Sequence, residues 1–207
     1  MEVLCDFISA TNVEMILEDW KCQYSNKTPI CDPCEWKGIF CDNTLQIVAF
    51  IFPQNSNLQG SLPSTIGLLS SLTSLNISLS SLSNTIPSAL GQLSKLIYLD
   101  ISTNSLVGSI PISLCNLNSL QYLNLRRNKL TSSIPSQIGL LTALSHLDFE
   151  LNSFTSSIPP TIGSLHSLTW LKFSYSSLTS SIPASITNLT RLQRLRWLPH
   201  YQQESGH

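Results

Sequence analysis

The stretch Leu130–Pro135 reads LTSSIP, and the same six letters return at Leu178–Pro183. A near copy, FTSSIP, stands between them at Phe154–Pro159, so that the three copies begin 24 residues apart. A fixed interval of this length is typical of repeat proteins, in which every copy is one structural unit that stacks on the next. The question is therefore how far the period extends along the chain.

The 24-residue period covers most of the sequence. In every aligned unit the sixteenth residue is proline, the residue before it is Leu or Ile, and the twenty-second residue is leucine. A single unit of this kind cannot bury its own leucines, but a stack of units can. The sequence therefore predicts a solenoid of six repeats, at residues 48–71, 72–95, 96–119, 120–143, 144–167 and 168–191.

Each unit contains the pattern of one short strand followed by a turn. In Leu96–Ile101, apolar residues alternate with others, as in a half-buried strand. An asparagine follows three residues later in three units, at Asn104, Asn128 and Asn152. We expect these amides to be buried and to bond backbone groups where the chain leaves the strand. The proline suits a turn, and the segment after it a short 3₁₀ or helical return.

Composition excludes several classes of protein. Charged residues make up 11% of the chain, the net charge is −1 and the pI is near 6.4, so the basic stripe of a nucleic-acid-binding protein is missing. No apolar run approaches the roughly 18 residues of a membrane span. The N-terminus, Met1–Asp6, lacks the basic start and apolar core of a secretory signal.

The units resemble the plant-type leucine-rich repeat, L-x-x-L-x-L-x-x-N-x-L-x-G-x-I-P-x-x-L-G-x-L. Leu106–Pro111, LVGSIP, keeps its central part, and Cys34–Cys41, CEWKGIFC, resembles an element of the family's N-terminal cap. Leu17–Trp20 resembles the end of the cap helix. The resemblance implies an α/β solenoid, a horseshoe with a parallel β-sheet on its concave face and a helical, disulfide-stapled cap. We expect the cap at 1–47, six repeats at 48–191, and an incomplete repeat and tail at 192–207.

The resemblance also implies a function. The family includes ectodomains of receptor-like kinases and receptor-like proteins, and polygalacturonase-inhibiting proteins. These are non-enzymatic recognition modules, so we expect a protein, peptide or glycan ligand on the concave face, with a co-receptor as a further partner. The expected location is extracellular or at the cell surface, with a cytoplasmic protein as the rival. Because the signal is missing and the pattern breaks after Trp197, the expectation is a fragment of a longer receptor.

The cysteines are unevenly distributed, with five in the first 41 residues. Such a cluster is typical of either disulfides or a metal site, and the spacing favours disulfides because no second C-x2-C and no nearby histidine accompany it. The resemblance implies a Cys34–Cys41 bridge. Cys22 with Cys31 is the expected second bridge, with a Cys5–Cys31 bridge as its rival. Cys5 and Cys115 are expected to be free.

Outward-facing strand positions predict where a ligand binds. Aromatic and arginine side chains, which carry most binding energy at interfaces, recur at the third position, and charged or amide side chains at the fifth. The third positions are Phe50, Ser74, Tyr98, Tyr122, His146, Trp170 and Arg194; the fifth are Phe52, Asn76, Asp100, Asn124, Asp148, Lys172 and Arg196. The predicted ligand-binding residues are Tyr98, Tyr122, Arg126, His146, Glu150, Trp170 and Lys172. The alternative is that Tyr and Asp there are ordinary repeat filler.

Catalysis is not indicated. Asp100 and Asp148 should lie about 10 Å apart on the strand spacing, near the upper limit for an inverting glycosidase pair, but both match the ordinary repeat pattern. His146 and Asp148 have no clearly placed nucleophile beside them. The four histidines lack the spacing of metal ligands, so neither a metal nor a cofactor is expected.

Two polar patterns suggest surface roles. The sequence Asn-x-Ser/Thr occurs at Asn26, Asn76 and Asn188, which are candidates for glycosylation. The copies of Thr-Ser-Ser at 131–133, 155–157 and 179–181 should align nine hydroxyls on one flank. Such a surface suggests binding to ice or a polysaccharide, whereas a simple tolerance for small polar residues is the plainer interpretation. A secreted inhibitor of a polysaccharide-degrading enzyme is the third alternative.

Overall fold

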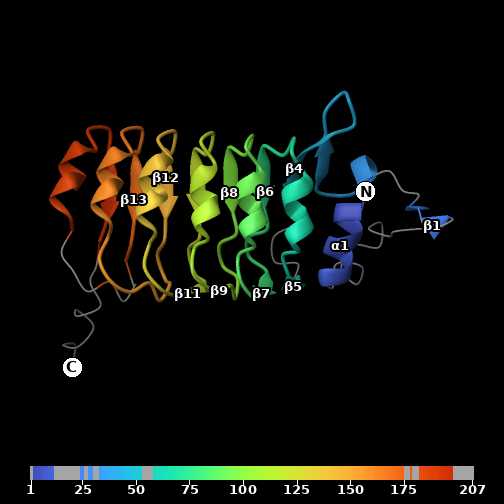
Figure 1. Ribbon diagram of the computed structural model, residues 1–207, viewed down its shortest axis with the longest axis horizontal. Coiled ribbons are helices and arrows are strands. Elements are labelled where there is room, and N and C mark those ends of the chain that lie inside the picture. The colour runs from blue at the N-terminus through green and yellow to red at the C-terminus, as the bar shows by residue number, and fades with distance from the viewer. Residues whose placement is uncertain are drawn as a thin grey trace.

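The repeats stack side by side in a single row (Figure 1). The computed structural model describes residues 2–11, 24–25, 28–29, 33–52, 58–174, 178 and 182–197. One sheet of eight strands runs along the row in the order β14-β13-β12-β10-β8-β6-β4-β3, and every pair is parallel except β3 with β4. The strands are β3 (Ile39–Cys41), β4 (Ile47–Ile51), β6 (Ser74–Asn76), β8 (Tyr98–Asp100), β10 (Tyr122–Asn124), β12 (His146–Asp148), β13 (Trp170–Lys172) and β14 (Arg194–Arg196).

The opposite side of the row is built from 3₁₀ helices. Each begins directly after the repeat proline, which is in an extended conformation, and ends before the repeat leucine. The 3₁₀ return predicted from the sequence is therefore confirmed. The helices are η3 (Ser64–Leu68), η4 (Ser88–Gln92), η5 (Ile112–Asn116), η6 (Ser136–Leu140), η7 (Pro160–Ser164) and η8 (Ala184–Asn188). The leucines and isoleucines of successive units form one continuous core between these helices and the sheet.

Short strands form a second set of pairs along one edge of the row (Figure 1). β5 (Gln59–Ser61) pairs with β7 (Ser81–Ser83), and β9 (Val107–Gly108) with β11 (Lys129–Leu130), all in parallel. At the thirteenth residue of the first five units the backbone turns with a positive φ, whether that residue is glycine or not. The described residues at this position are Gly60, Asn84, Gly108, Ser132 and Ser156, with φ from 64° to 105°.

The predicted asparagine bonds are confirmed in all three units. Asn128 is buried, its Oδ1 accepts from the Leu106 amide at 3.1 Å, and its Nδ2 donates to the carbonyls of Ile101 at 3.0 Å and Leu125 at 3.1 Å. Asn104 and Asn152 make the equivalent bonds one unit earlier and one unit later. Each amide thus joins its own unit to the preceding one.

The N-terminal cap covers the first repeat. Helix α1 (Glu2–Ala10) lies against η3 and β5, and Phe7 packs edge-on against Phe50 with ring centroids 5.0 Å apart. Further cap elements are β1 (Tyr24–Ser25), which pairs antiparallel with β2 (Thr28–Pro29), and η2 (Pro33–Glu35). The Leu17–Trp20 segment lies outside the described residues.

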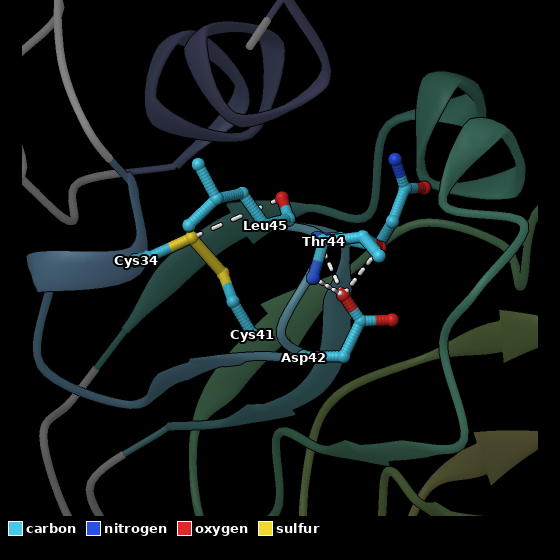
Figure 2. The surroundings of a disulfide bond; sticks show 6 residues. Cys34, Cys41, Asp42, Thr44 and Leu45 are labelled. Carbon is cyan, nitrogen blue, oxygen red and sulfur yellow. Dashed lines mark hydrogen bonds between the residues drawn. A yellow bond between two sulfur atoms is a disulfide. The ribbon is translucent and has the colours of Figure 1, made fainter.

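A disulfide joins Cys34 and Cys41, the pair that the family resemblance implies (Figure 2). It links η2 to the end of β3, beside a tight turn into β4. In that turn Asp42 Oδ1 accepts hydrogen bonds from the Thr44 amide at 2.8 Å and the Thr44 hydroxyl at 2.7 Å. These bonds lower the pKa of Asp42, the Thr44 side chain having the largest effect.

The expectation for Cys5 was wrong, because Cys5 is disulfide-bonded. Its partner lies outside the described residues, as do Cys22 and Cys31. Because Cys34 pairs with Cys41 and Cys115 is free, the predicted pairing of Cys22 with Cys31, which leaves Cys5 free, was also wrong, whereas the rival Cys5–Cys31 bridge stays a prediction. Cys115 is a free, buried thiol, in agreement with the sequence, and burial raises its pKa to about 11.

The predicted register of the first repeat was also wrong. Ala49 and Ile51, rather than Phe50 and Phe52, pair in line with the outward-facing residues of β6, so both phenylalanines lie in the core. A slip of one residue exchanges the two faces of a strand. Here both faces of β4 are apolar, and the larger rings occupy the core beside Phe7.

Candidate functional site: the concave face

Four aromatic side chains on neighbouring strands form a continuous stack. Tyr98 and Tyr122 lie with ring centroids 4.3 Å apart and planes 10° from parallel, and Tyr122 and His146 lie 4.3 Å apart at 14°. His146 and Trp170 continue the stack at 5.4 Å and 28°. The strands pair in register, with each residue directly opposite the next, which places the rings close to the strand spacing of about 4.8 Å. We call Tyr98, Tyr122, His146 and Trp170 the aromatic stack.

Stacking determines which part of each ring a ligand meets. Within the aromatic stack the inner ring faces cover one another, and all four side chains are partly exposed. The edges of the rings therefore form the accessible surface. An edge presents the positive rim of the ring and the polar atoms of tyrosine and histidine.

Cationic side chains close the C-terminal end of the stack. Lys172 Nζ lies 4.6 Å from the centroid of the Trp170 ring, and the Arg194 guanidinium carbon lies 4.4 Å from it. Both distances are within the range of a cation–π contact. Lys172 also pairs with Asp148, with Nζ and Oδ2 3.3 Å apart. The structure thus brings Lys172, one of the predicted ligand contacts, to the stack and adds Arg194, which shares the third-position column but was not among the predicted ligand contacts.

The aspartates of this face bond to neighbouring residues of the protein. Asp100 accepts hydrogen bonds from the Ser102 amide at 2.9 Å, Asn124 Nδ2 at 3.1 Å and, at 3.5 Å, the Tyr98 hydroxyl. Asp148 accepts from the Glu150 amide at 3.0 Å and pairs with Lys172. Both aspartates are buried, so their carboxyl groups are occupied by neighbours and carry no indication of acid–base chemistry.

Glu150 was predicted to contact the ligand, but it is buried: only 1% of the residue is accessible. Arg126 Nε lies 3.9 Å from one of its carboxylate oxygens and Arg196 Nε 3.3 Å from the other. The two arginine side chains, 41% and 49% exposed, shield the carboxylate from solvent, and they are the accessible groups at this place. Arg126 is therefore accessible to a ligand, as predicted for a binding residue, and Arg196 is accessible at the same place.

Burial keeps the aromatic stack neutral. It lowers the pKa of His146, against the smaller opposing effect of Asp148. Burial, together with Tyr122 and Asp100, raises the pKa of Tyr98 above its ordinary range, and burial also raises the pKa of Tyr122. The charge on this face is therefore carried by the side chains around the stack and not by the stack itself.

The other predicted surface residues lie away from the stack or at its N-terminal end. Asn76 lies at the end of β6, and Asn188 is exposed at the end of η8, beside a shallow hollow that His166 and Arg191 also line. Asn26 is outside the described residues. The hydroxyl-bearing residues 131–133 and 155–157 are exposed on the flank, and residues 179–181 are outside the described part of the chain. Their binding to ice or polysaccharide stays a prediction.

Neither a metal-binding cluster nor a membrane-spanning helix occurs among the described residues. No group of three or more His, Cys, Asp or Glu side chains there could hold a metal ion. None of the described helices has the length and apolar character needed to cross a membrane.

Comparison with known proteins identifies the repeats. The family described as "Leucine-rich repeat region" matches residues 111–206, and "Leucine rich repeat" matches residues 70–130, so that together they cover residues 70–206. The chain belongs to the leucine-rich repeat family. The plant-type repeat expected from the sequence is confirmed by similarity to plant receptor kinases.

Among curated proteins, this leucine-rich repeat protein is 36% identical over 76 residues to a probable leucine-rich repeat receptor-like serine/threonine-protein kinase of Arabidopsis thaliana. That match covers 36% of this chain and 9% of the kinase. Most of the kinase therefore lies outside the comparison.

Solved ectodomains match a larger part of the chain. The PEPR1–AtPEP1 complex is 32% identical with a TM-score of 0.79, covering 96% of this chain and 28% of that one. The Arabidopsis receptor kinase HAESA ectodomain, solved with an extended IDA peptide hormone, is 31% identical with a TM-score of 0.79, covering 95% and 32%. A chain of the Arabidopsis BIR3–SERK2 complex is 30% identical with a TM-score of 0.72, covering 88% and 97%. The chain therefore spans under a third of the first two ectodomains.

Proposed function

We propose that this chain is the recognition part of a receptor-like protein at the cell surface, and that it binds a peptide segment along its concave face. The observation that carries the proposal is the aromatic stack with cations at its C-terminal end. Aromatic and arginine side chains are the residue types in which binding energy concentrates. The similarity to ectodomains solved with peptides supports it.

The orientation of the rings favours a peptide over a glycan as the main ligand. A sugar binds an aromatic side chain by lying on the face of the ring, and the faces inside the stack are occupied by neighbouring rings. Ring edges and tyrosine hydroxyls instead suit backbone carbonyls and side chains of an extended peptide. Because Lys172 and Arg194 close the C-terminal end, a glycan is left only the outer face of Tyr98 at the N-terminal end of the stack.

Charge favours an acidic peptide. The three carboxylates of this face, on Asp100, Asp148 and Glu150, are at most 7% exposed. The arginines beside them are largely accessible: the side chains of Arg126 and Arg196 are 41% and 49% exposed. A ligand therefore meets cations first, and charge complementarity selects acidic groups and speeds association.

Peptide display tests the proposal. A random peptide library is selected for binding to the full chain, so that peptides are free to bind the flank and the convex side as well as the concave face. We expect enrichment of peptides that carry Asp or Glu, and their binding should weaken with salt because the cations are exposed. Enriched peptides without acidic residues, or a selection that yields no binder, would contradict the proposal.

A stability comparison tests whether the key variant stays folded. Trp170→Ser removes one ring of the stack and should lower the free energy of unfolding by about 1 kcal/mol, the size of an aromatic pair. Leu171→Ala, at the neighbouring buried position, should lower it by about 2–5 kcal/mol. Denaturant unfolding measures both, and equal losses would mean that Trp170 is a core residue.

A further inference from the structure

The concave face has a gap on the N-terminal side of the aromatic stack. Ser74 is the register partner of Tyr98 on β6, and Ser74 in turn pairs with Ala49 on β4. The Tyr98 ring therefore has Tyr122 on one face, while its other face points toward a strand whose side chain is too short to cover a ring. This outer ring face is open to a group that stands above β6.

Asn76 stands on the same strand and begins the sequence Asn76-Ile77-Ser78. Its Oδ1 accepts hydrogen bonds from the Ser78 amide at 3.1 Å and from the Ser78 hydroxyl at 2.8 Å. These two bonds fix the side-chain amide. Its Nδ2, the atom to which an N-linked sugar is joined, makes no hydrogen bond within the described residues, and the residue is partly exposed. Asn76 thus has the sequence of an acceptor and an amide nitrogen that no described residue occupies.

We propose that Asn76 carries an N-linked glycan whose first N-acetylglucosamine packs on the open face of Tyr98. In the transfer, Nδ2 forms a bond to the anomeric carbon of the sugar and loses one proton, while the bond from that carbon to the pyrophosphate of a lipid-linked donor breaks. The inference rests on the proposed cell-surface location, since the secretory pathway supplies this donor. The glycan ends the aromatic stack on its N-terminal side and confines a peptide to the part from Tyr122 to Arg196.

Asn188 provides a matched control within the same chain. It also begins an acceptor sequence, Asn188-Leu189-Thr190, and it is exposed at the end of η8. The hollow beside it is lined by His166, Ser167, Thr187, Thr190 and Arg191, with no phenol or indole ring among these described residues. A glycan on Asn188 therefore has no ring comparable to Tyr98 to pack on.

The test directs the full chain through the secretory pathway of plant cells and measures site occupancy by glycopeptide mass spectrometry. Thermal unfolding then compares Asn76→Gln in the Tyr98 and the Tyr98→Ala backgrounds. We expect Asn76 to be occupied, and its substitution to lower Tm by about 2–4 °C only when Tyr98 is present. Any cost of losing the Ser78 bonds is common to both backgrounds and cancels. Asn188→Gln should leave Tm unchanged.

Each outcome decides part of the proposal. An unoccupied Asn76 overturns it, whatever the state of Asn188. An occupied Asn76 whose substitution lowers Tm equally in both backgrounds overturns the packing on Tyr98. The peptide selection reports binding, whereas this test reports site occupancy and Tm, so a failure here is distinguishable from a failure of the proposed function.

Discussion

At the scale of single residues, the thirteenth position of each repeat shows a conflict between sequence and backbone. Ser132 and Ser156 hold φ values of 68° and 67°, at the place where Gly60 and Gly108 stand in other units. The left-handed region costs an ordinary residue about 1–2 kcal/mol. The two Thr-Ser-Ser copies within the described residues, at 131–133 and 155–157, are therefore also slightly strained.

Replacing the strained serine should stabilise the protein. We expect Ser156→Gly to raise the free energy of unfolding by about 0.5–1 kcal/mol, because relief of strain exceeds the added flexibility of glycine in the unfolded chain. Ser157→Gly is the control, since Ser157 is exposed but is not among the residues with positive φ, and it should be destabilising. Denaturant unfolding of both variants gives the sign, and a loss of stability in Ser156→Gly would contradict the strain.

His146 should make stability depend on pH. Its folded-state pKa is lowered by burial below the ordinary value of about 6.5, so in mildly acidic solution the unfolded chain binds a proton more readily than the folded one. The contribution of His146 to stability is thus complete above about pH 6.5 and is lost as pH falls from there toward its folded pKa. The groups that act on it are Tyr122, Trp170, Asp148, Lys172 and Asp100.

The His146→Gln variant checks this directly. Its free energy of unfolding should decline less than that of the parent between about pH 6.5 and 5, the window in which this histidine titrates in the unfolded chain. Thermal unfolding across this range measures the two slopes. Parallel slopes would show that His146 titrates equally in the folded and unfolded states.

At the scale of elements, the buried asparagines link one repeat to the next. Asn128→Ala should cost about 3 kcal/mol, because it leaves the Leu106 amide and the Ile101 and Leu125 carbonyls without their partner. Asn118→Ala, at an exposed position, should stay within about 0.5 kcal/mol of the parent. Denaturant unfolding provides the comparison, and similar costs at the two sites would mean that water replaces the amide.

At the scale of the whole molecule, the sequence predicted what repeats and missed what occurs once. Proline, leucine and asparagine recur in step, so the strands, the 3₁₀ returns and the asparagine bonds follow from the period. The first repeat has one residue more between its strand and Pro63 than the next repeat has before Pro87, and both faces of β4 are apolar, so periodicity alone could not choose its register.

The sequence predicted which side chains of the concave face lie in line, but not which of them are buried. The register of β8 to β14 follows the period, which places Tyr98, Tyr122, His146 and Trp170 in line. Glu150 lies beneath Arg126 and Arg196 because the long arginine side chains reach across strands. The spacing of residues in the sequence does not predict such contacts. The bond of Cys5 likewise depends on how the cap folds.

The central claim is that a peptide binds on the aromatic stack, and calorimetric titration of one display-selected peptide tests it most directly. The titration compares the parent chain with Trp170→Ser and with Leu140→Ser, which removes an apolar side chain, 56% exposed, from the opposite side. We predict about a 30-fold weaker Kd for Trp170→Ser, the loss expected at a binding hot spot, and an unchanged Kd for Leu140→Ser. Full affinity in Trp170→Ser would contradict the account.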